Sequence, residues 1–372
     1  MRGAHDTPCR FVCALAACLA APPPAVPAAE NAPRPALLWR HNAGAAVTAQ
    51  PALQGDRIAF TTRSGTITLM DVHGRLLWSA AVRDDTNGPA VFEAPPAFAC
   101  GRVIVVSTRG WVSALGTNGA TAWQYPCGED VRAAPLVATE EPAPRLFVLT
   151  QPGGIVHCLD AQTGRRIWRS EATNRSDGSP ALAAGRILFG NCDAALHAVD
   201  AASGRTLTRV ALGADCQVAA GVAADGALAY CGTRSGAVCC VDVERGTVVW
   251  TNGASKAETF TTPVLCGRLV VIGSFDGSLY AFDRGSGALA WTCPLSGTPG
   301  NPVVHGADVI VGAGGKLRAI AAGDGRERWS IAISDEIAAP VVSGDNLLVA
   351  GDDGSVSAYC ISPEKPAGGR HP

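Results

Sequence analysis

The sequence of 372 residues has little charge and none of the common catalytic or metal-binding motifs. Its apolar runs are too short to cross a membrane as a helix. Charged residues make up 17% and the net charge is −2, so the chain lacks the basic surface that nucleic acid requires. Cys-x-x-Cys, His-Glu-x-x-His and Gly-x-Ser-x-Gly do not occur. We therefore expect no nucleic-acid partner, no catalytic residue, no metal ligand and no cofactor.

The residues that most suggest chemistry have a structural explanation. Cys239 and Cys240 are adjacent in a predicted strand, where successive side chains point to opposite faces. His157 and His197 each lie three residues before a turn aspartate, at the place of Tyr280 in another repeat, and are expected to be packing residues. Disulfide pairing cannot be derived from spacing. The recurrence of cysteines at equivalent strand positions favours small apolar fillers over a full disulfide framework.

The N-terminus has the pattern of an export signal. Arg2 and Arg10 precede an apolar run from Phe11 to Ala21, which is too short to span a membrane as a helix. We expect a signal peptide over residues 1–29 with cleavage near Ala28. An alternative is lipidation of Cys18, because Leu15 to Cys18 is similar to a bacterial lipobox. Either route exports the chain to the periplasm, and lipidation would anchor it to the outer membrane.

One short frame recurs along the rest of the chain. In Asp160 to Trp168 an aspartate enters a tight turn, Gly164 supplies its positive φ, and a tryptophan follows in the next strand. The frame returns about every 40 residues, which indicates a β-propeller with four strands per unit. The tryptophans expected to dock one blade on the next are Trp39, Trp78, Trp123, Trp168, Trp250, Trp291 and Trp329.

The two ends of the repeat are incomplete in complementary ways. The last unit stops at Tyr359-Cys360 without an outer strand, and the segment around Trp39 is an outer strand without the other three. Pairing them closes the ring and removes its exposed edges. We therefore predict an all-β fold, an eight-bladed β-propeller of four-stranded antiparallel blades over residues 37–361. A leader over 30–36 and a disordered tail over 362–372 flank it.

Blades 4 and 5 are predicted to be the least regular part of the ring. Thr208 stands where the other units have the docking tryptophan, so the wedge beside blade 4 should be less well filled. Ala220-Gly221 replaces the small residue and proline that begin the other inner strands. Departures of this kind arise at functional sites as well as by drift.

The segments Cys158 to Trp168 and Leu279 to Trp291 resemble the tryptophan-docking repeat of pyrroloquinoline-quinone (PQQ)-like propellers. That superfamily contains quinoprotein dehydrogenases and non-enzymatic propellers, so the fold does not choose the function. Length, signal and eight blades are most similar to the periplasmic lipoprotein subunit of the outer-membrane β-barrel assembly machinery. The resemblance implies a non-catalytic scaffold that binds the periplasmic domains of the barrel-forming subunit through loops of the middle blades.

The resemblance also implies where a partner would bind. The matching loops are residues 173–179 and 213–219, which contain Arg175, Asp177 and Asp215. Arg175 lies five residues before Pro180, where that family carries a contact arginine, whereas Asp215 only approximates the acidic contacts. A second set of candidates consists of three arginines that are predicted to share one hairpin position in blades 1, 2 and 5, where they could bind an acidic partner. This set is Arg63, Arg109 and Arg234.

These features predict an exported, non-catalytic protein-binding scaffold with an envelope protein as partner, which assists outer-membrane protein assembly. Membrane contact would arise only through a lipid anchor, and the chain is expected to be a monomer outside its complex. The alternatives are a quinone-binding oxidoreductase or sensor, and a propeller that binds an envelope polysaccharide. A quinoprotein dehydrogenase would carry long insertions and acidic calcium ligands, and the chain has no insertion long enough for a substrate lid.

Overall fold

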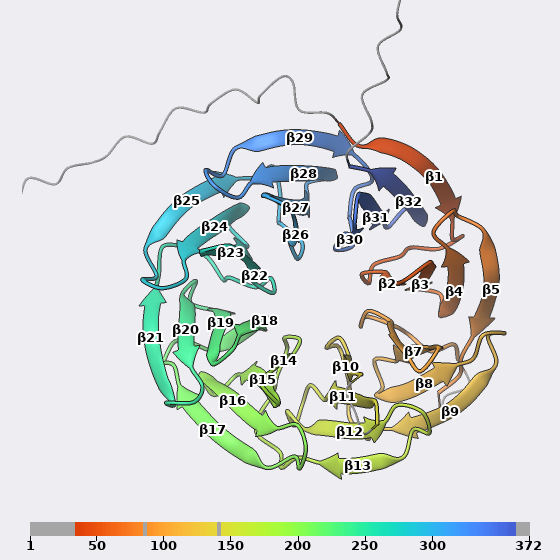
Figure 1. Ribbon diagram of the computed structural model, residues 1–372, viewed down its shortest axis with the longest axis horizontal. Helices are drawn as coiled ribbons and strands as arrows, with labels where there is room; N and C mark the ends of the chain where they lie inside the picture. Colours follow the sequence, from red (N-terminus) through yellow and green to blue (C-terminus); the bar gives the residue numbers. More distant parts are fainter. Residues whose placement is uncertain (1–33, 85–87, 140–142, 362–372) are drawn as a thin grey trace, which may run out of the picture.

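A computed structural model describes residues 34–84, 88–139 and 143–361, and in these residues the regular secondary structure is β-strand throughout. The strands form eight four-stranded antiparallel sheets arranged as blades around a central axis, as Figure 1 shows for the described residues. This architecture confirms the predicted eight-bladed propeller. The predicted signal peptide, the cleavage site near Ala28, Cys18 and the tail over 362–372 lie outside the described residues.

Blades are numbered 1 to 8 from residue 52 onward, and each contributes four strands from the axis outward. The inner strands are β2 (Ala52–Gln54), β6 (Ala97–Ala99), β10 (Leu136–Ala138), β14 (Ala181–Ala183), β18 (Val218–Asp225), β22 (Val264–Cys266), β26 (Val303–His305) and β30 (Val341–Ser343). The second strands are β3 (Arg57–Thr61), β7 (Arg102–Val106), β11 (Arg145–Leu149), β15 (Arg186–Asn191), β19 (Leu228–Thr233), β23 (Leu269–Ser274), β27 (Asp308–Ala313) and β31 (Asn346–Ala350). The third strands are β4 (Thr66–Asp71), β8 (Trp111–Leu115), β12 (Val156–Asp160), β16 (Ala195–Asp200), β20 (Val238–Asp242), β24 (Ser278–Asp283), β28 (Lys316–Ala321) and β32 (Ser355–Cys360). The outer strands are β5 (Leu76–Ala81), β9 (Thr121–Pro126), β13 (Arg166–Arg169), β17 (Thr206–Ala211), β21 (Thr247–Asn252), β25 (Leu289–Pro294), β29 (Glu327–Ala332) and β1 (Ala36–Asn42).

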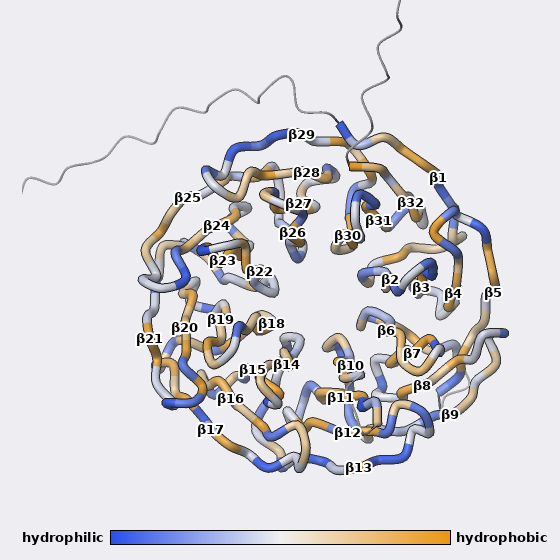
Figure 2. The backbone as a smooth tube through the Cα atoms, in the orientation of Figure 1, coloured by the Kyte–Doolittle hydropathy of each residue, from blue (hydrophilic) through white to orange (hydrophobic). Residues whose placement is uncertain are grey.

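The core lies in the second and third strands of every blade. Their continuous apolar runs, such as Val103 to Val106, are buried because both faces of a blade pack against neighbouring blades. Outer strands alternate instead, with more exposed side chains on the circumference. Figure 2 shows this distribution as apolar segments in the middle of the blades and hydrophilic stretches along outer strands such as β13 and β29. The described residues contain no helix able to cross a membrane.

Blade 8 is made from both ends of the chain. The strand β1 pairs antiparallel with β32, with Ala36 opposite Cys360 and Asn42 opposite Ser355. Figure 1 places β1 between β29 and β5 on the circumference, so the first strand completes the ring. The predicted closure is confirmed.

Blades pack through a tryptophan on one outer strand and a glycine in the next blade's turn. A Cβ atom on Gly164 would lie 2.5 Å from Cδ2 of Trp123, so only glycine leaves room for the indole. Gly164 also has φ +73°, which side-chain-bearing residues rarely adopt. The indole of Trp291 donates from Nε1 to the carbonyl oxygen of Ala322 at 2.8 Å and is nearly buried.

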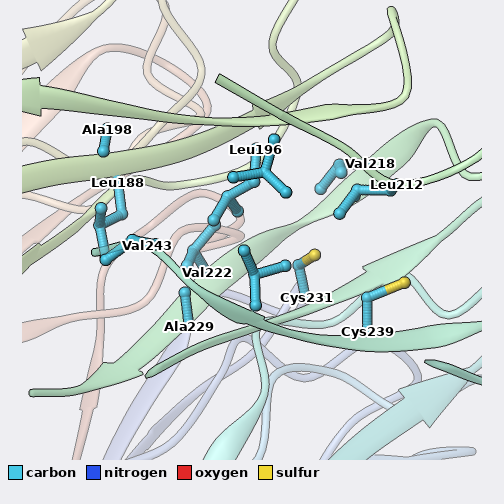
Figure 3. Close-up of a cluster of buried hydrophobic side chains, with 12 residues drawn as sticks. Leu188, Leu196, Ala198, Leu212, Val218, Val222, Ala229, Cys231, Cys239 and Val243 are labelled. Atoms are coloured by element: carbon cyan, nitrogen blue, oxygen red, sulfur yellow. The ribbon is translucent and has the colours of Figure 1, made fainter. Parts of the chain in front are cut away.

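The interface between blades 4 and 5 solves the same packing problem differently. A Cβ atom placed on the turn glycine Gly246 would lie 3.4 Å from Cγ2 of Thr208, so the threonine packs less closely on the glycine than an indole does. The inner strand β18 is longer than any other inner strand of the described residues and packs Val218 against Gly190 of β15. Figure 3 shows the resulting cluster, in which residues of blades 4 and 5 interdigitate. The irregularity predicted here is therefore present, and a longer strand supplies the missing contact.

Substituting two equivalent turn glycines should separate indole docking from backbone strain. Gly246 and Gly287 have φ angles of +67° and +72°, so alanine is strained at both. A Cβ on Gly287 would also lie 2.5 Å from Cδ2 of Trp250. We expect Gly287→Ala to lower the free energy of unfolding by about 1–3 kcal/mol more than Gly246→Ala, because only the former overpacks an indole. Equal losses in urea unfolding would contradict the docking mechanism.

Candidate functional site

The ring has two different rims. Antiparallel pairing places the second-to-third-strand hairpins and the blade-to-blade connections on one rim, which we call the hairpin rim. In seven blades a backbone N–H of the hairpin donates to a carbonyl of the preceding connection, with N···O distances from 2.7 to 3.1 Å. The residues that donate are Arg63, Thr108, Gln151, Cys192, Arg234, Phe275 and Asp352. This bond defines equivalent positions around the rim.

One sequence prediction needs correction on this basis. Arg63 and Arg234 are equivalent, but the equivalent residue of blade 2 is Thr108 and not Arg109. Arg109 lies one residue further along its hairpin, because its turn glycine, Gly110, follows it directly. All three arginines lie on the hairpin rim and are exposed.

Asp177 is the centre of a polar network on this rim. Its carboxylate accepts hydrogen bonds from Nε of Arg175 at 2.8 Å, from Nη2 of Arg234 at 2.9 Å and from Nε2 of Gln151 at 2.7 Å. Nη1 of Arg234 also lies 3.7 Å from a carboxylate oxygen of Glu258. The network therefore joins the hairpins of blades 3 and 5 to the connections before blades 4 and 6.

The network favours the ionised form of Asp177 and leaves part of the Arg175 side chain exposed to solvent. Burial opposes ionisation of Asp177, but hydrogen bonds from Arg175 and Gln151 outweigh it and the pKa of the carboxyl is lowered. The Asp177 side chain is 14% exposed, whereas that of Arg175 is 57% exposed. Because the bond to Asp177 uses Nε, the terminal amino groups of Arg175 remain available to an acceptor on a partner.

The other predicted contact residues lie apart from the network. Asp215 is exposed in a turn closed by the hydrogen bond from the N–H of Cys216 to the carbonyl of Gly213, with N···O 3.1 Å. This turn leads to Gln217, whose carbonyl holds the hairpin of Arg234. Asp215 therefore borders the network, while Arg63 and Arg109 lie on blades 1 and 2.

Sequence reasoning missed Gln151 and Glu258, which complete the network. Neither is conspicuous in its own repeat, because Gln151 stands in a hairpin and Glu258 in a connection of ordinary composition. A stricter alignment of the hairpins would have placed Gln151 at the position of Arg234. The contact of Glu258 depends on how neighbouring blades are set side by side, and the sequence alone contains no signal for it.

The two histidines are buried, His157 against Tyr125 of the preceding blade and His197 against Phe189 of its own blade. Nδ1 of His157 lies 3.0 Å from the hydroxyl of Tyr125, and the His197 ring stacks on Phe189 with centroids 5.3 Å apart. Burial, followed by the charge of a neighbouring arginine, lowers the pKa of each imidazole to about 4. These contacts agree with the packing role expected for both.

The vicinal cysteines also separate as expected. Cys239 packs in the cluster between blades 4 and 5, whereas Cys240 packs in the cluster between blades 5 and 6. Burial raises the pKa of the Cys239 thiol to about 12 and that of Cys240 to about 11. Two thiols on opposite faces of one strand do not offer a joint surface to a ligand.

No group of three or more His, Cys, Asp or Glu side chains that could hold a metal ion occurs within residues 34–84, 88–139 and 143–361. The rim opposite the hairpin rim carries hollows between blades, including one of about 660 Å³ between blades 3 and 4. Arg145 lines it but donates from Nη1 to the carbonyl oxygens of Ala201 and Ala202. That arginine therefore connects the two blades.

Comparison with known proteins identifies related chains. A family model described as outer membrane protein assembly factor BamB matches residues 28–191 and 192–366. BamB of Burkholderia pseudomallei is 26% identical over 293 residues, which is 74% of this chain and 73% of that protein. BamB of Bordetella pertussis is 26% identical over 268 residues, or 68% of this chain and 66% of that protein.

Solved structures with low sequence identity share the fold. The crystal structure of BamB from Moraxella catarrhalis has a TM-score of 0.72 at 20% identity, and the match covers 90% of this chain and 100% of that chain. The computationally designed Ika8 protein has a TM-score of 0.71 at 16% identity, with 87% of this chain and 98% of that chain covered. At these identities the likeness concerns the fold alone.

The buried histidines should make the fold sensitive to acid. The pKa of each is about 4 in the folded state and about 6.5 when unfolded, so the unfolded chain binds more protons as pH falls through 6.5 towards 4. We expect each histidine to lower the free energy of unfolding by about 1–2 kcal/mol between pH 7 and pH 5. His197→Gln should reduce this loss in urea unfolding at the two pH values. The control His73→Gln, which removes an exposed histidine, should leave it unchanged, and equal pH dependence of all variants would contradict the assignment.

Proposed function

The chain belongs to the outer membrane protein assembly factor BamB family, and from this premise we propose that it is a non-catalytic scaffold of the cell envelope that assists assembly of outer-membrane β-barrel proteins. Its proposed partner is the barrel-forming subunit of the assembly machinery, bound through that subunit's periplasmic domains. The chain would act after export to the periplasm, either free or anchored through a lipid on Cys18.

The observation that carries the proposal is the fixed network around Asp177 on the hairpin rim. Arg175 is exposed and oriented by a charged hydrogen bond to Asp177, and the turn of Asp215 leads to Gln217, which holds the hairpin of Arg234. A side chain held in this way loses little freedom on binding, which favours it as an interface anchor. The proposed contact comprises Arg175, Asp177, Asp215 and Arg234, while Arg63 and Arg109 would extend it only to a partner that spans several blades.

The burial of the side chains best suited to redox or acid–base chemistry also supports a binding role. The two most conspicuous candidates for redox chemistry, Cys239 and Cys240, are buried in separate clusters. His157 and His197 are buried between blades and engaged by neighbouring side chains. The superfamily includes enzymes, so the absence of catalysis remains part of the proposal.

Binding to the partner's periplasmic domains should depend on Arg175. We expect Arg175→Ala to weaken the affinity measured by calorimetry at least tenfold, which is about 1.4 kcal/mol, because the guanidinium is lost and its acceptor on the partner is left without a donor. The matched control is Arg165→Ala, an exposed arginine of blade 3 on the opposite rim. Equal affinities of both variants and the unchanged chain would reject the proposed contact, and no binding by any of them would reject the proposed function.

The chain should not act as a quinoprotein. Titration with pyrroloquinoline quinone and calcium is expected to show no stoichiometric binding, since the described residues contain no acidic cluster suited to a metal ion. The measurement is quinone absorbance after gel filtration, together with a dye-linked dehydrogenase assay. Stoichiometric quinone binding with dehydrogenase activity would overturn the scaffold proposal.

A further inference from the structure

Two phenylalanines form an exposed aromatic stack on the hairpin rim of blade 6. The rings of Phe260 and Phe275 have centroids 3.8 Å apart and planes inclined by 11°. Phe275 is 51% exposed, although a large apolar side chain gains most free energy when buried. The stack therefore leaves apolar area that a second molecule could cover.

The propeller repeat does not require these rings. Phe275 occupies the hairpin position held in other blades by polar residues or cysteine: Arg63, Thr108, Gln151, Cys192, Arg234 and Asp352. Phe260 lies two residues after the carbonyl that bonds the hairpin, and blades 1 to 4 have polar residues there: Thr48, Glu93, Arg132 and Asp177. The same corner is thus built repeatedly without aromatic side chains, so packing of the fold does not explain the stack.

Backbone hydrogen bonds hold the stack in place. The N–H of Phe275 donates to the carbonyl of Glu258 at 3.0 Å, and the N–H of Phe260 donates to the carbonyl of Gly273 at 3.3 Å. Between them Thr259 is fully buried, and its hydroxyl accepts from the N–H of Thr233 at 2.8 Å. A surface ordered before binding loses little conformational entropy when a partner arrives.

The stack is continuous with the network around Asp177. The backbone carbonyl of Glu258 bonds Phe275, and its carboxylate faces Arg234, which bonds Asp177. Blades 4, 5 and 6 follow one another around the ring in Figure 1, so these contacts form one ridge. We define the ridge as Arg175, Asp177, Arg234, Glu258, Phe260 and Phe275.

Two cations on or beside the ridge are open to carboxylates of a partner. Arg175, Arg234 and Lys256 are exposed cations. The carboxylate of Asp177 is occupied by the arginines, and that of Asp276 accepts from the Tyr280 hydroxyl at 2.5 Å. The terminal amino groups of Arg175 and the ammonium group of Lys256 therefore face outward, whereas the guanidinium of Arg234 is paired with Asp177 and Glu258.

We propose that the ridge is a single contact surface for a polypeptide segment that places an apolar side chain on Phe275 and carboxylates beside Arg175 and beside Lys256, which lies next to the ridge. The inference rests on the proposed function, because the segment is assigned to the periplasmic domains of the barrel-forming subunit. It extends the contact from the arginine network to blade 6 and specifies the partner's chemistry.

The first test compares two exposed apolar residues of blade 6. Leu289 in β25 is 45% exposed but lies on the outer circumference, away from the ridge. We expect Phe275→Ala to weaken binding of the purified periplasmic domains at least tenfold by calorimetry and Leu289→Ala to change it less than twofold. Phe275→Leu, which retains apolar area, should recover part of the loss. Urea unfolding of each variant checks that the fold is intact.

The outcomes distinguish this inference from the function on which it rests. If Phe275→Ala binds like the unchanged chain while Arg175→Ala loses affinity, the ridge proposal is wrong and the proposed function stands. If the unchanged chain does not bind the periplasmic domains, both are overturned. A loss at Phe275 that Leu289→Ala reproduces would show a non-specific apolar effect and would also reject the ridge.

A second test identifies the chemistry of the occupant. A photoreactive phenylalanine analogue replaces Phe275 in one chain and Leu289 in another, and each is irradiated with the periplasmic domains. We expect a crosslink only from position 275, mapped by mass spectrometry to an apolar residue with Asp or Glu nearby in its sequence. A crosslink to a segment without carboxylates, or equal crosslinking from position 289, would contradict the proposal.

Discussion

The packing of an indole on a glycine in the next blade's turn is the interaction on which the ring depends. A blade is a twisted four-stranded sheet that cannot bury both faces alone, and a wedge remains between adjacent blades towards the circumference. The indole fills that wedge, and the turn glycine lets it approach to van der Waals distance. Where the indole is missing, at Thr208, the longer strand β18 moves the compensating contact towards the axis.

The same arrangement explains why the conspicuous side chains of the repeat are structural. Third-strand residues such as His157, His197 and Cys239 are buried, and burial shifts their pKa values in the direction that favours the neutral form. Groups held neutral between sheets contribute to packing and to acid sensitivity. Residues able to meet another molecule therefore lie on the rims and on the outer strands of the circumference.

The hairpin rim has a second level of order, which supports the binding role proposed for it. A backbone hydrogen bond ties each hairpin to the preceding connection in seven blades, so side chains at equivalent positions are presented on rigid supports. Substitution at these positions changes the surface with little effect on the fold. Blades 3 to 6 use this freedom to place a charged network beside an aromatic stack, and the proposed partner surface follows from that local combination.

The sequence by itself determined the eight-bladed ring, its closure through the strand around Trp39 and the irregularity at Thr208, because periodic hydrophobicity and turn residues act within one repeat. It also singled out Arg175, Asp177 and Arg234, which the structure brings into one network, although it misaligned Arg109 by one residue. Only the tertiary structure decided that Asp177 bonds Arg234 of blade 5, that Glu258 joins them and that Phe260 stacks on Phe275. The physical reason is that contacts between connections depend on the relative placement of blades, which closure of the whole ring sets and no single repeat encodes.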